Sequence, residues 1–402
     1  MNADGNPCYL RLPAFVCGFR LALKPQMSAG KKGFHLRSSA FICGFLVLVG
    51  SGCRSPRGTA FEGYAFVAAA GSPAIAVVDL ASFSVTRHIR LESPPAQIVS
   101  DAARRALYVM GEGGPAGLSI IDTVRLEPKR SLWLADQPRR LRLSPDGARL
   151  YVIDARARLF QAFDPEKLTH GPQIRLAAPP VDFDLSFDGR WACVSLSTNE
   201  VQILDLEQWR ATATVAVGAE PAAVAIRADG RQAFVGNRAG RSVSLVDLAA
   251  GRLIAHLPLH ARPEALRLKP DGGELFVSGG DAGVVAIVSA FRNEVDPPLL
   301  AGAEPRDIAV TRDNRLLLVA NSGANSVSVM DIADRRVLAS VPVGEEPHRI
   351  ALTTDDQYAL VLNRKSGDMA VIRTAAVARG RQPLFTMIPV GSRPVDLAVQ
   401  PR

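Results

Sequence analysis

Cysteine is scarce in this chain, with five residues among 402, at positions 8, 17, 43, 53 and 193. No two of them form a CxxC pair, none begins a CxxCH haem-attachment sequence, and none has the spacing of zinc ligands. This pattern excludes a disulfide framework. We expect Cys193, within the apolar run Trp191–Leu196, to be a small buried side chain.

The motifs of the common enzyme classes are also missing. The chain has no GxSxG elbow, no HExxH and no Walker loop. His256 and His260 are four residues apart, but four residues of a strand span about 13 Å, so these two side chains cannot bind one ion. We therefore expect no metal site and no cofactor.

A dense basic stripe is the third missing feature. The formal net charge is +8, but residues 1–52 contain six Lys or Arg and a single acid, and residues 53–402 contain 41 basic and 38 acidic residues. No basic cluster dominates that second region. Since nucleic-acid binding usually needs such a cluster, we expect no nucleic-acid partner.

The N-terminal part has the layout of a secretion signal. Its apolar run, residues 40–49, is too short to span a bilayer as a helix, and it follows three basic residues between positions 31 and 37. Residues 50–53, GSGC, resemble the lipobox of bacterial lipoproteins, with Gly50 where Leu is usual. The resemblance implies cleavage before Cys53 and lipidation of that cysteine. The alternative is an ordinary secretory signal cut at a nearby small residue.

This layout predicts the organisation of the chain and its location. Residues 1–52 are a leader whose true start is expected at Met27, residues 53–60 are a short tether, and residues 61–402 form one domain. A diacylated or triacylated cysteine anchors a protein stably. We therefore expect an extracytoplasmic, lipid-anchored monomer, periplasmic or associated with the outer membrane.

A unit of about 42 residues repeats along the mature chain, most regularly over residues 217–257. It contains four short apolar runs, at residues 222–226, 232–236, 242–248 and 252–257, which are separated by turn residues. The third run alternates with period two, and no run has a helical period. Four antiparallel strands per unit are typical of a propeller blade.

The number of units can be read from two marker residues that recur at equivalent positions in each unit. A proline opens each first run, and the residue that ends each third run is usually acidic and recurs every 41 to 43 residues. The prolines are Pro95, Pro138, Pro180, Pro221, Pro263, Pro305, Pro347 and Pro394, and the third-run positions are Asp79, Asp122, Asp164, Asp205, Asp247, Ser289, Asp331 and Arg373. We therefore predict an all-β propeller of eight blades, with seven as the alternative. The acidic residues are expected to cap turns.

The two markers are out of phase at the chain ends. The domain starts with a second-type run, residues 64–70, and ends with a lone first-type run, residues 394–399. We predict that these two runs pair, so that the first blade takes three strands from the N-terminal side and one from the C-terminus. Residues 375–382 are expected to be an inserted connection in the last unit.

Several units, such as residues 301–341 (AGAEPRDIAVTRDNRLLLVANSGANSVSVMDIADRRVLASV) and 342–372, resemble the YVTN-type repeat. That repeat occurs in YncE-like periplasmic proteins, archaeal surface-layer proteins and the wider quinoprotein amine dehydrogenase-like superfamily. The resemblance covers residues 61–402 and implies a propeller. It implies little about function, because propellers host many activities.

The residues two places after the prolines are the candidate site. In ring order they are Asp396, Gln97, Arg140, Asp182, Ala223, Ala265, Asp307 and Arg349. We expect the first strands to line the axis, so that these side chains, with Arg306 and His348, meet at one mouth, where they could bind a polar ligand. The distribution of acidic and basic residues on neighbouring blades favours the structural interpretation, in which Arg140 pairs with Asp182, Arg349 with Asp307 and Asp396, and Arg142 with Asp184. His348, expected in an exposed loop, is the lone acid–base candidate.

Two functions remain open. The first is a non-catalytic platform that binds an envelope protein or a small ligand through the axial mouth and the connecting loops. The alternative is an enzyme or redox accessory of the lactonase or quinoprotein type, which would act at the mouth near His348, Arg349 and Asp396.

Overall fold

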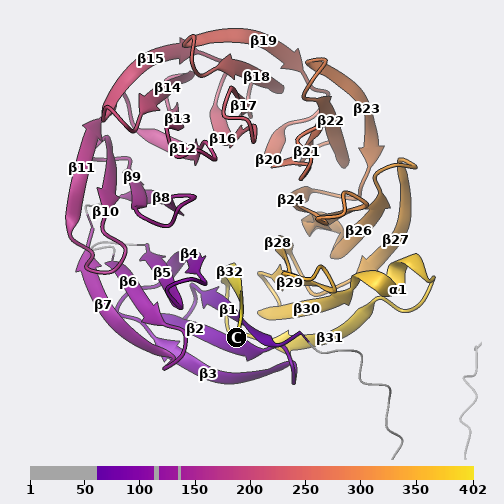
Figure 1. Cartoon of the computed structure of the whole chain (residues 1–402). Helices are drawn as coiled ribbons and strands as arrows, with labels where there is room; N and C mark the ends of the chain where they lie inside the picture. The colour runs from indigo at the N-terminus through magenta and orange to yellow at the C-terminus, as the bar shows by residue number, and fades with distance from the viewer. Residues whose placement is uncertain (1–60, 113–116, 135–136) are drawn as a thin grey trace, which may run out of the picture. The chain divides into compact units, whose positions relative to one another are not determined.

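The computed structural model describes residues 61–112, 117–134 and 137–402, and the predicted leader and tether lie outside these ranges. The described residues form eight four-stranded antiparallel sheets arranged around a common axis (Figure 1). The protein is an eight-bladed all-β propeller, which confirms eight blades over the alternative of seven.

The strands are as follows. The closure blade contains β1 (Gly63–Ala69), β2 (Ala74–Asp79), β3 (Ser84–Arg90) and β32 (Pro394–Pro401). The next three blades contain β4 (Pro95–Asp101), β5 (Ala106–Gly111), β6 (Gly117–Asp122) and β7 (Glu127–Trp133); β8 (Pro138–Leu143), β9 (Leu150–Asp154), β10 (Leu159–Phe163) and β11 (His170–Arg175); and β12 (Pro180–Leu185), β13 (Trp191–Leu196), β14 (Glu200–Asp205) and β15 (Arg210–Ala216). The fifth and sixth contain β16 (Pro221–Ile226), β17 (Gln232–Asn237), β18 (Ser242–Asp247) and β19 (Arg252–Pro258); and β20 (Pro263–Leu268), β21 (Glu274–Gly279), β22 (Val284–Ser289) and β23 (Glu294–Leu300). The last two contain β24 (Pro305–Val310), β25 (Leu316–Asn321), β26 (Ser326–Asp331) and β27 (Arg336–Pro342), with the 3-10 turn η1 (Ser322–Ala324); and β28 (Pro347–Leu352), β29 (Tyr358–Asn363), β30 (Asp368–Arg373) and β31 (Leu384–Pro389), with the helix α1 (Thr374–Ala378).

Local turn chemistry explains the strand boundaries in the fifth blade. Between β16 and β17 the chain reverses at Gly230, whose φ of 69° lies in the left-handed region that favours glycine. The Gly230 N–H donates to the Arg227 carbonyl at 2.8 Å, and the Asp229 carboxylate accepts the Arg231 N–H at 3.0 Å. These bonds close a tight turn and stop both strands where the sequence predicts.

The acidic residues at the ends of the third strands cap turns, as predicted. One oxygen of Asp122 accepts the N–H groups of Val124 and Arg125, both at 2.9 Å. Asp164, which follows β10, accepts two N–H groups in the same way. These backbone hydrogen bonds lower the pKa of both carboxyl groups, because they stabilise the ionised form.

The core lies between neighbouring blades. In one cluster Phe234 of β17 packs with Leu275 of β21, so its apolar side chains come from two sheets. Neither side chain is exposed to solvent. Cys193 of β13 is also fully buried, as predicted, and burial raises the pKa of its thiol. Because each blade buries its faces against its neighbours, the ring is the smallest unit that covers every apolar face.

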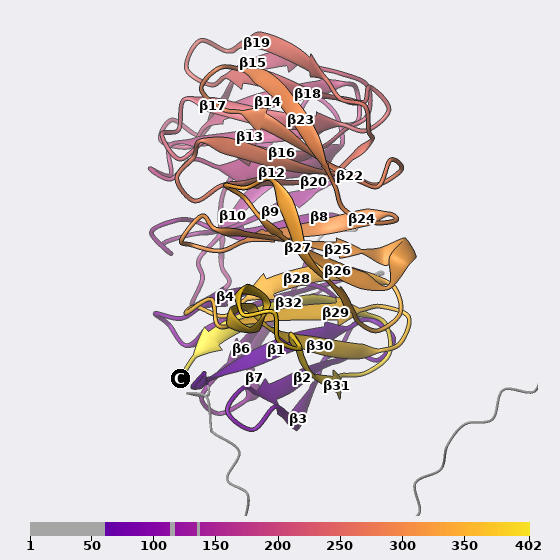
Figure 2. The same cartoon turned by 90° about the vertical axis from the view of Figure 1, so that its right-hand side faces the viewer.

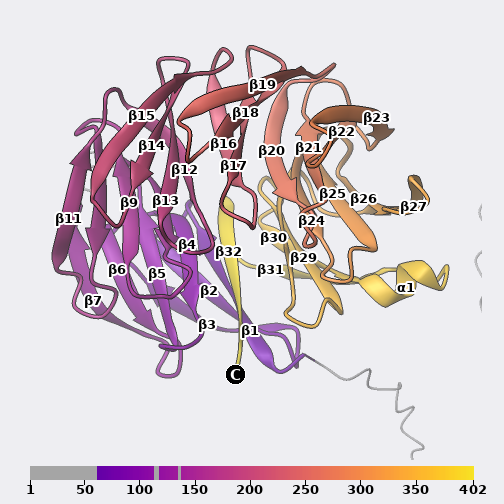
Figure 3. The same cartoon turned by 45° about the horizontal axis from the view of Figure 1, so that its top comes forward.

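The ring closes through the two ends of the domain. Strand β32 pairs antiparallel with β1, with Phe66 opposite Ala398, and β1 continues the sheet to β2 and β3 (Figure 3). The closure blade therefore takes three strands from the N-terminal side and one from the C-terminus, as predicted. Figure 2 shows this blade beside the last one, β28 to β31.

One element departs from the expectation of strands without helices. The short helix α1, of sequence TAAVA, begins at Thr374 and overlaps the predicted connection at residues 375–382. Alanine is the best helix former, but five residues are too few to produce a visible helical period. None of the helices in the described part of the chain is long and apolar enough to cross a membrane.

Candidate functional site

The innermost strand of each blade carries the candidate residues. Strands β4, β8, β12, β16, β20, β24, β28 and β32 form the edge of each sheet that faces the axis (Figure 1), and each begins with its marker proline. Proline is tolerated at the first position of an edge strand, because its missing N–H leaves no ladder bond unmade. The eight side chains two places after these prolines, called here the axial ring, therefore occupy equivalent positions in the eight blades.

The acidic members of the axial ring hold neighbouring blades together. Asp396 of β32 accepts the Ile98 N–H of β4 at 3.0 Å, and Asp307 of β24 accepts the Ile350 N–H of β28 at 3.0 Å. Gln97 repeats the pattern, since its Oε1 accepts the Leu141 N–H of β8 at 2.9 Å. In each case a side chain satisfies a backbone amide in the next blade, which is a structural role.

The basic members pair with these acids as the structural alternative predicts. Arg349 lies between two carboxylates, with Nε 2.9 Å from Asp396 and Nη1 3.6 Å from Asp307. The negative charge of Asp396, followed by that of Asp307, raises the pKa of Arg349. Arg140 Nε lies 3.0 Å from Asp182. All of the ring pairs that the sequence predicts are thus present.

A second layer lies two residues deeper. The predicted pair is found here, with Arg142 Nη1 3.5 Å from Asp184, and burial raises the pKa of Asp184 against the opposing charge of Arg142. Arg267 of β20 also belongs to this layer, with Nη2 3.7 Å from Asp307. Desolvation among the surrounding blades lowers the pKa of Arg267, although solvent still reaches 45% of its side chain. The charge of Asp307 opposes this shift, and the positive charges of Arg349 and Arg142 add to it. Three guanidinium groups therefore converge on the axis from different blades.

The sequence reasoning missed Arg267, although a signal was present. It stands four places after its proline, as Arg142 does, so reading the fourth position in every blade, beyond the pair of Arg142 with Asp184, would have found it.

Solvent reaches the two kinds of charged side chain very differently. Arg140, Arg267 and Arg349 expose between 40% and 48% of their side chains, whereas the carboxylates they contact expose at most 8%. A guanidinium has five N–H donors, and these contacts use only some of them. The polar groups that the axis presents to solvent are therefore mainly hydrogen-bond donors with positive charge.

His348 does not occupy the exposed loop expected for it. It is the second residue of β28 and half-buried, because the strand begins one residue earlier, at Pro347. Its Nε2 donates to the Val395 carbonyl at 3.3 Å, and its Nδ1 is buried with no hydrogen-bond partner in the described part of the chain. Burial lowers the pKa of the ring. The free nitrogen that would act as a base is thus turned away from solvent.

Arg306, the remaining predicted residue, lies at the rim of the mouth. Its Nη1 is 3.5 Å from Glu264 and its Nη2 is 3.6 Å from Glu304. Glu264 also pairs with Arg238 of the fifth blade. Arg306 therefore belongs to an ion-pair network between blades and is 43% exposed.

The other histidines do not gather with acids or cysteines. His256 lies on β19, where Nδ1 is 2.8 Å from the Ser244 hydroxyl, and His260 follows that strand. Within the described ranges no three His, Cys, Asp or Glu residues are placed to hold a metal ion. The predicted lipidation residue, Cys53, lies outside the described residues.

One segment of the chain matches a family model. Residues 292–392 match "Lactonase, 7-bladed beta-propeller". The match covers about a quarter of the chain and contains Asp307, His348 and Arg349. The ring has eight blades, one more than the description of that family states. No curated protein matches the chain.

Solved propellers are similar in structure. The chain aligns with dihydro-heme d1 dehydrogenase NirN in complex with DHE at a TM-score of 0.71 and 14% identity, covering 85% of this chain and 76% of that one. It aligns with Kuenenia stuttgartiensis hydrazine synthase at 0.56 and 20% identity, covering 72% and 98%. A functionally unknown protein from Desulfotomaculum acetoxidans aligns at 0.56 and 14% identity, covering 75% and 98%. At these identities the likeness establishes the fold alone.

Proposed function

We propose that this protein is a non-catalytic binding platform whose axial mouth holds an anionic group of a small ligand or of an envelope protein. The observation that carries the proposal is the contrast in exposure between the arginines of the axis and their carboxylate partners. An incoming anion meets guanidinium N–H groups, while the carboxylates that would repel it are buried against backbone amides. Carboxylate and phosphate groups match guanidinium geometry best.

The absence of an available base supports a binding role over catalysis at this mouth. His348 uses one ring nitrogen on a carbonyl and buries the other. Asp307 and Asp396 each accept a backbone N–H and contact Arg349. A general base must reach the proton that it abstracts, and none of these three groups presents a free acceptor to solvent.

Titration of the protein with citrate and with tripolyphosphate, followed by calorimetry at low salt, tests the proposal. We expect saturable binding that weakens as salt rises, and at least a tenfold weaker affinity when Arg140→Gln and Arg349→Gln are combined. Arg312→Gln is the matched control. It removes an exposed arginine from the turn after β24, whose side chain has no partner among the described residues. Equal affinities of the double variant and the control would contradict the proposal.

A lactonase is the second candidate, because residues 292–392 match the lactonase model. Such an enzyme would need a group at the mouth that activates water, and the exposed arginines would then stabilise the developing oxyanion. Hydrolysis of a panel of lactones at neutral pH, lost in Arg349→Gln and kept in Arg312→Gln, would favour this function over the platform.

We also propose that the platform is anchored in the cell envelope through Cys53. The proposal rests on the sequence resemblance of residues 50–53 to a lipobox and on the YVTN-type repeats, which are shared with YncE-like periplasmic proteins. Pull-down of the wild type and of the double arginine variant from solubilised envelopes identifies the partner. A partner that the double variant still captures would place its docking surface away from the axial ring.

A further inference from the structure

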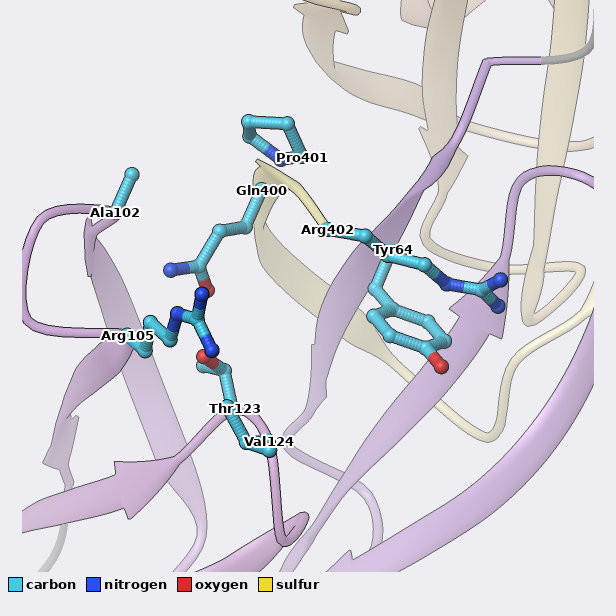
Figure 4. A pocket seen from close by; sticks show the side chains of 8 residues that line it. All are labelled: Tyr64, Ala102, Arg105, Thr123, Val124, Gln400, Pro401 and Arg402. Carbon is cyan, nitrogen blue, oxygen red and sulfur yellow. The ribbon is translucent and has the colours of Figure 1, made fainter.

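We propose that a second site, in the seam between the closure blade and the next one, binds a small carboxylate with an apolar body. A cavity of about 400 Å³ lies there, which is within the usual size range of small-molecule sites. It is bounded by the start of β1, the end of β32, the turn after β4 and the residues after β6 (Figure 4). The axial ring lies toward the opposite, proline-bearing ends of the inner strands, so the two sites are separate.

The walls of the cavity combine apolar and basic groups. Tyr64, Val124 and Pro401 contribute apolar surface, and Val124 is 62% exposed. Arg402 lies over the Tyr64 ring, 4.7 Å from its centroid, and its Nη2 contacts Asp79 at 2.9 Å. The positive charge of Arg402 is thus compensated, and its stem covers the ring.

Arg105 also lines the cavity, and it has no counter-ion among the residues that the structure describes. No hydrogen bond or ion pair engages its side chain within the described residues, and the residue is exposed. Its neighbour Arg104 is different, since Nη1 lies 2.9 Å from Asp101. The backbone of Arg105 is held at a φ of 50°, and its carbonyl accepts the Thr123 N–H at 3.0 Å. The free guanidinium is therefore carried by a fixed turn.

An incomplete polar group lies beside it. Gln400 of β32 is 3% exposed, and its Nε2 donates to the Asp101 carbonyl at 3.2 Å, but no described residue donates a hydrogen bond to its Oε1. Gln400, Arg105 and Thr123 line the same cavity (Figure 4). Buried polar groups are normally paired, and this atom is an acceptor, so it needs a donor and a ligand carboxylate does not satisfy it. The Arg105 guanidinium has five N–H donors, enough to serve both the amide oxygen and a bound carboxylate.

Chemistry selects the ligand class. A guanidinium without a counter-ion recognises a carboxylate through two parallel hydrogen bonds. The neighbouring Tyr64, Val124 and Pro401 favour an aromatic or aliphatic body of modest size. A neutral ligand of the same shape would leave the Arg105 charge uncompensated, and a larger polyanion would gain nothing from the apolar walls.

Calorimetry on the full chain with 3-phenylpropionate and its neutral analogue 3-phenylpropionamide tests the proposal. We expect saturable binding of the carboxylate and an affinity for the amide at least about ten times lower, since hydrogen bonds to charged groups are the stronger ones. Arg105→Gln should weaken carboxylate binding by roughly ten- to a hundredfold. Arg312→Gln, which removes an equally free arginine from the corresponding turn after β24, should leave it unchanged.

A third variant probes the seam itself. Gln400→Glu would place a carboxylate of the protein beside Arg105, so it should abolish ligand binding while the circular dichroism spectrum stays that of a folded propeller. The combined Arg140→Gln and Arg349→Gln variant, which lacks only the arginines of the axis, should still bind 3-phenylpropionate saturably in this cavity. Absence of saturable binding, equal affinities for acid and amide, an unaffected Arg105→Gln variant, or loss of binding in the double axial variant would each overturn the proposal.

Discussion

Replacement of Asp396 by alanine should open the propeller at its closure blade. Asp396 lies on β32, the strand that the C-terminus contributes, and it contacts both neighbouring blades. Its Oδ2 accepts the Ile98 N–H of β4 at 3.0 Å, and its Oδ1 accepts the Arg349 Nε–H of β28 at 2.9 Å. The variant removes both interactions, so that β32 is then held in the ring mainly by its pairing with β1.

The expected magnitude follows from these two contacts. Ile98 is 5% exposed, so its amide has little access to water, and an unpaired buried donor costs about 1–3 kcal/mol. The bond from Arg349 is charge-assisted, and about half of its value should survive, because Asp307 lies 3.6 Å away. We expect the free energy of unfolding to fall by about 3 kcal/mol in Asp396→Ala.

Asp307→Ala is the matched control. Asp307 accepts the Ile350 N–H at 3.0 Å and contacts Arg349 and Arg267, so its loss removes comparable interactions. The two strands differ in how they are joined to their sheets. The chain runs directly from β24 into β25 of the same blade, whereas β32 is joined to β1 by hydrogen bonds and side-chain contacts alone.

Urea unfolding and hydrogen exchange separate the two variants. Both should lower the free energy of unfolding by similar amounts, but only Asp396→Ala should speed exchange of the β1 and β32 amides under native conditions. The reasoning is refuted if the two variants show the same exchange pattern, or if Asp396→Ala costs less than about 1 kcal/mol.

Three further predictions concern single residues. Burial lowers the pKa of His348 in the folded protein. As the pH falls below about 6.5, the histidine is therefore protonated in the unfolded state before it is protonated in the folded state. The free energy of unfolding should decrease over this pH range, down to the folded pKa. His348→Gln should remove that part of the loss, which urea unfolding at pH 7.5 and pH 5 measures. Gly344→Ala should lower the free energy of unfolding by about 1–3 kcal/mol, because the new Cβ would lie 2.7 Å from Asn363 Nδ2; a thermal melt equal to that of the wild type would contradict this. Cys53→Ser should abolish incorporation of labelled fatty acid and release the protein from membranes, and continued labelling would rule out Cys53 as the acceptor.

Much of the fold could be predicted because its determinants are local. Proline opens each inner strand, Asp or Asp-Gly closes the turns, and apolar residues alternate between them, so one repeat contains most of what it needs. The phase difference between the two markers also predicted the pairing of β32 with β1. The helix α1 was missed, since one turn is too short to show a period.

The candidate site was predictable only in part. The pairs of Arg140 with Asp182 and of Arg349 with Asp396 were found because equivalent positions in neighbouring repeats meet at the axis. The burial of His348 was not, since it depends on the Val395 carbonyl of another blade. The close approach of Gly344 to Asn363 was likewise invisible, because it joins a loop to the end of a strand 19 residues later.

The sequence by itself determined the repeat, the number of blades and the way the ring closes, because each of these follows from short-range patterns repeated about every 42 residues. Only the tertiary structure decided which charged groups face solvent. Around the axis the carboxylates are buried against backbone amides, for Asp307 and Asp396 those of the next blade, and the guanidinium groups remain accessible; in the cavity beside the closure blade, Arg105 has no counter-ion among the described residues. Those outcomes depend on how adjacent blades are positioned against each other, and no single repeat contains that information.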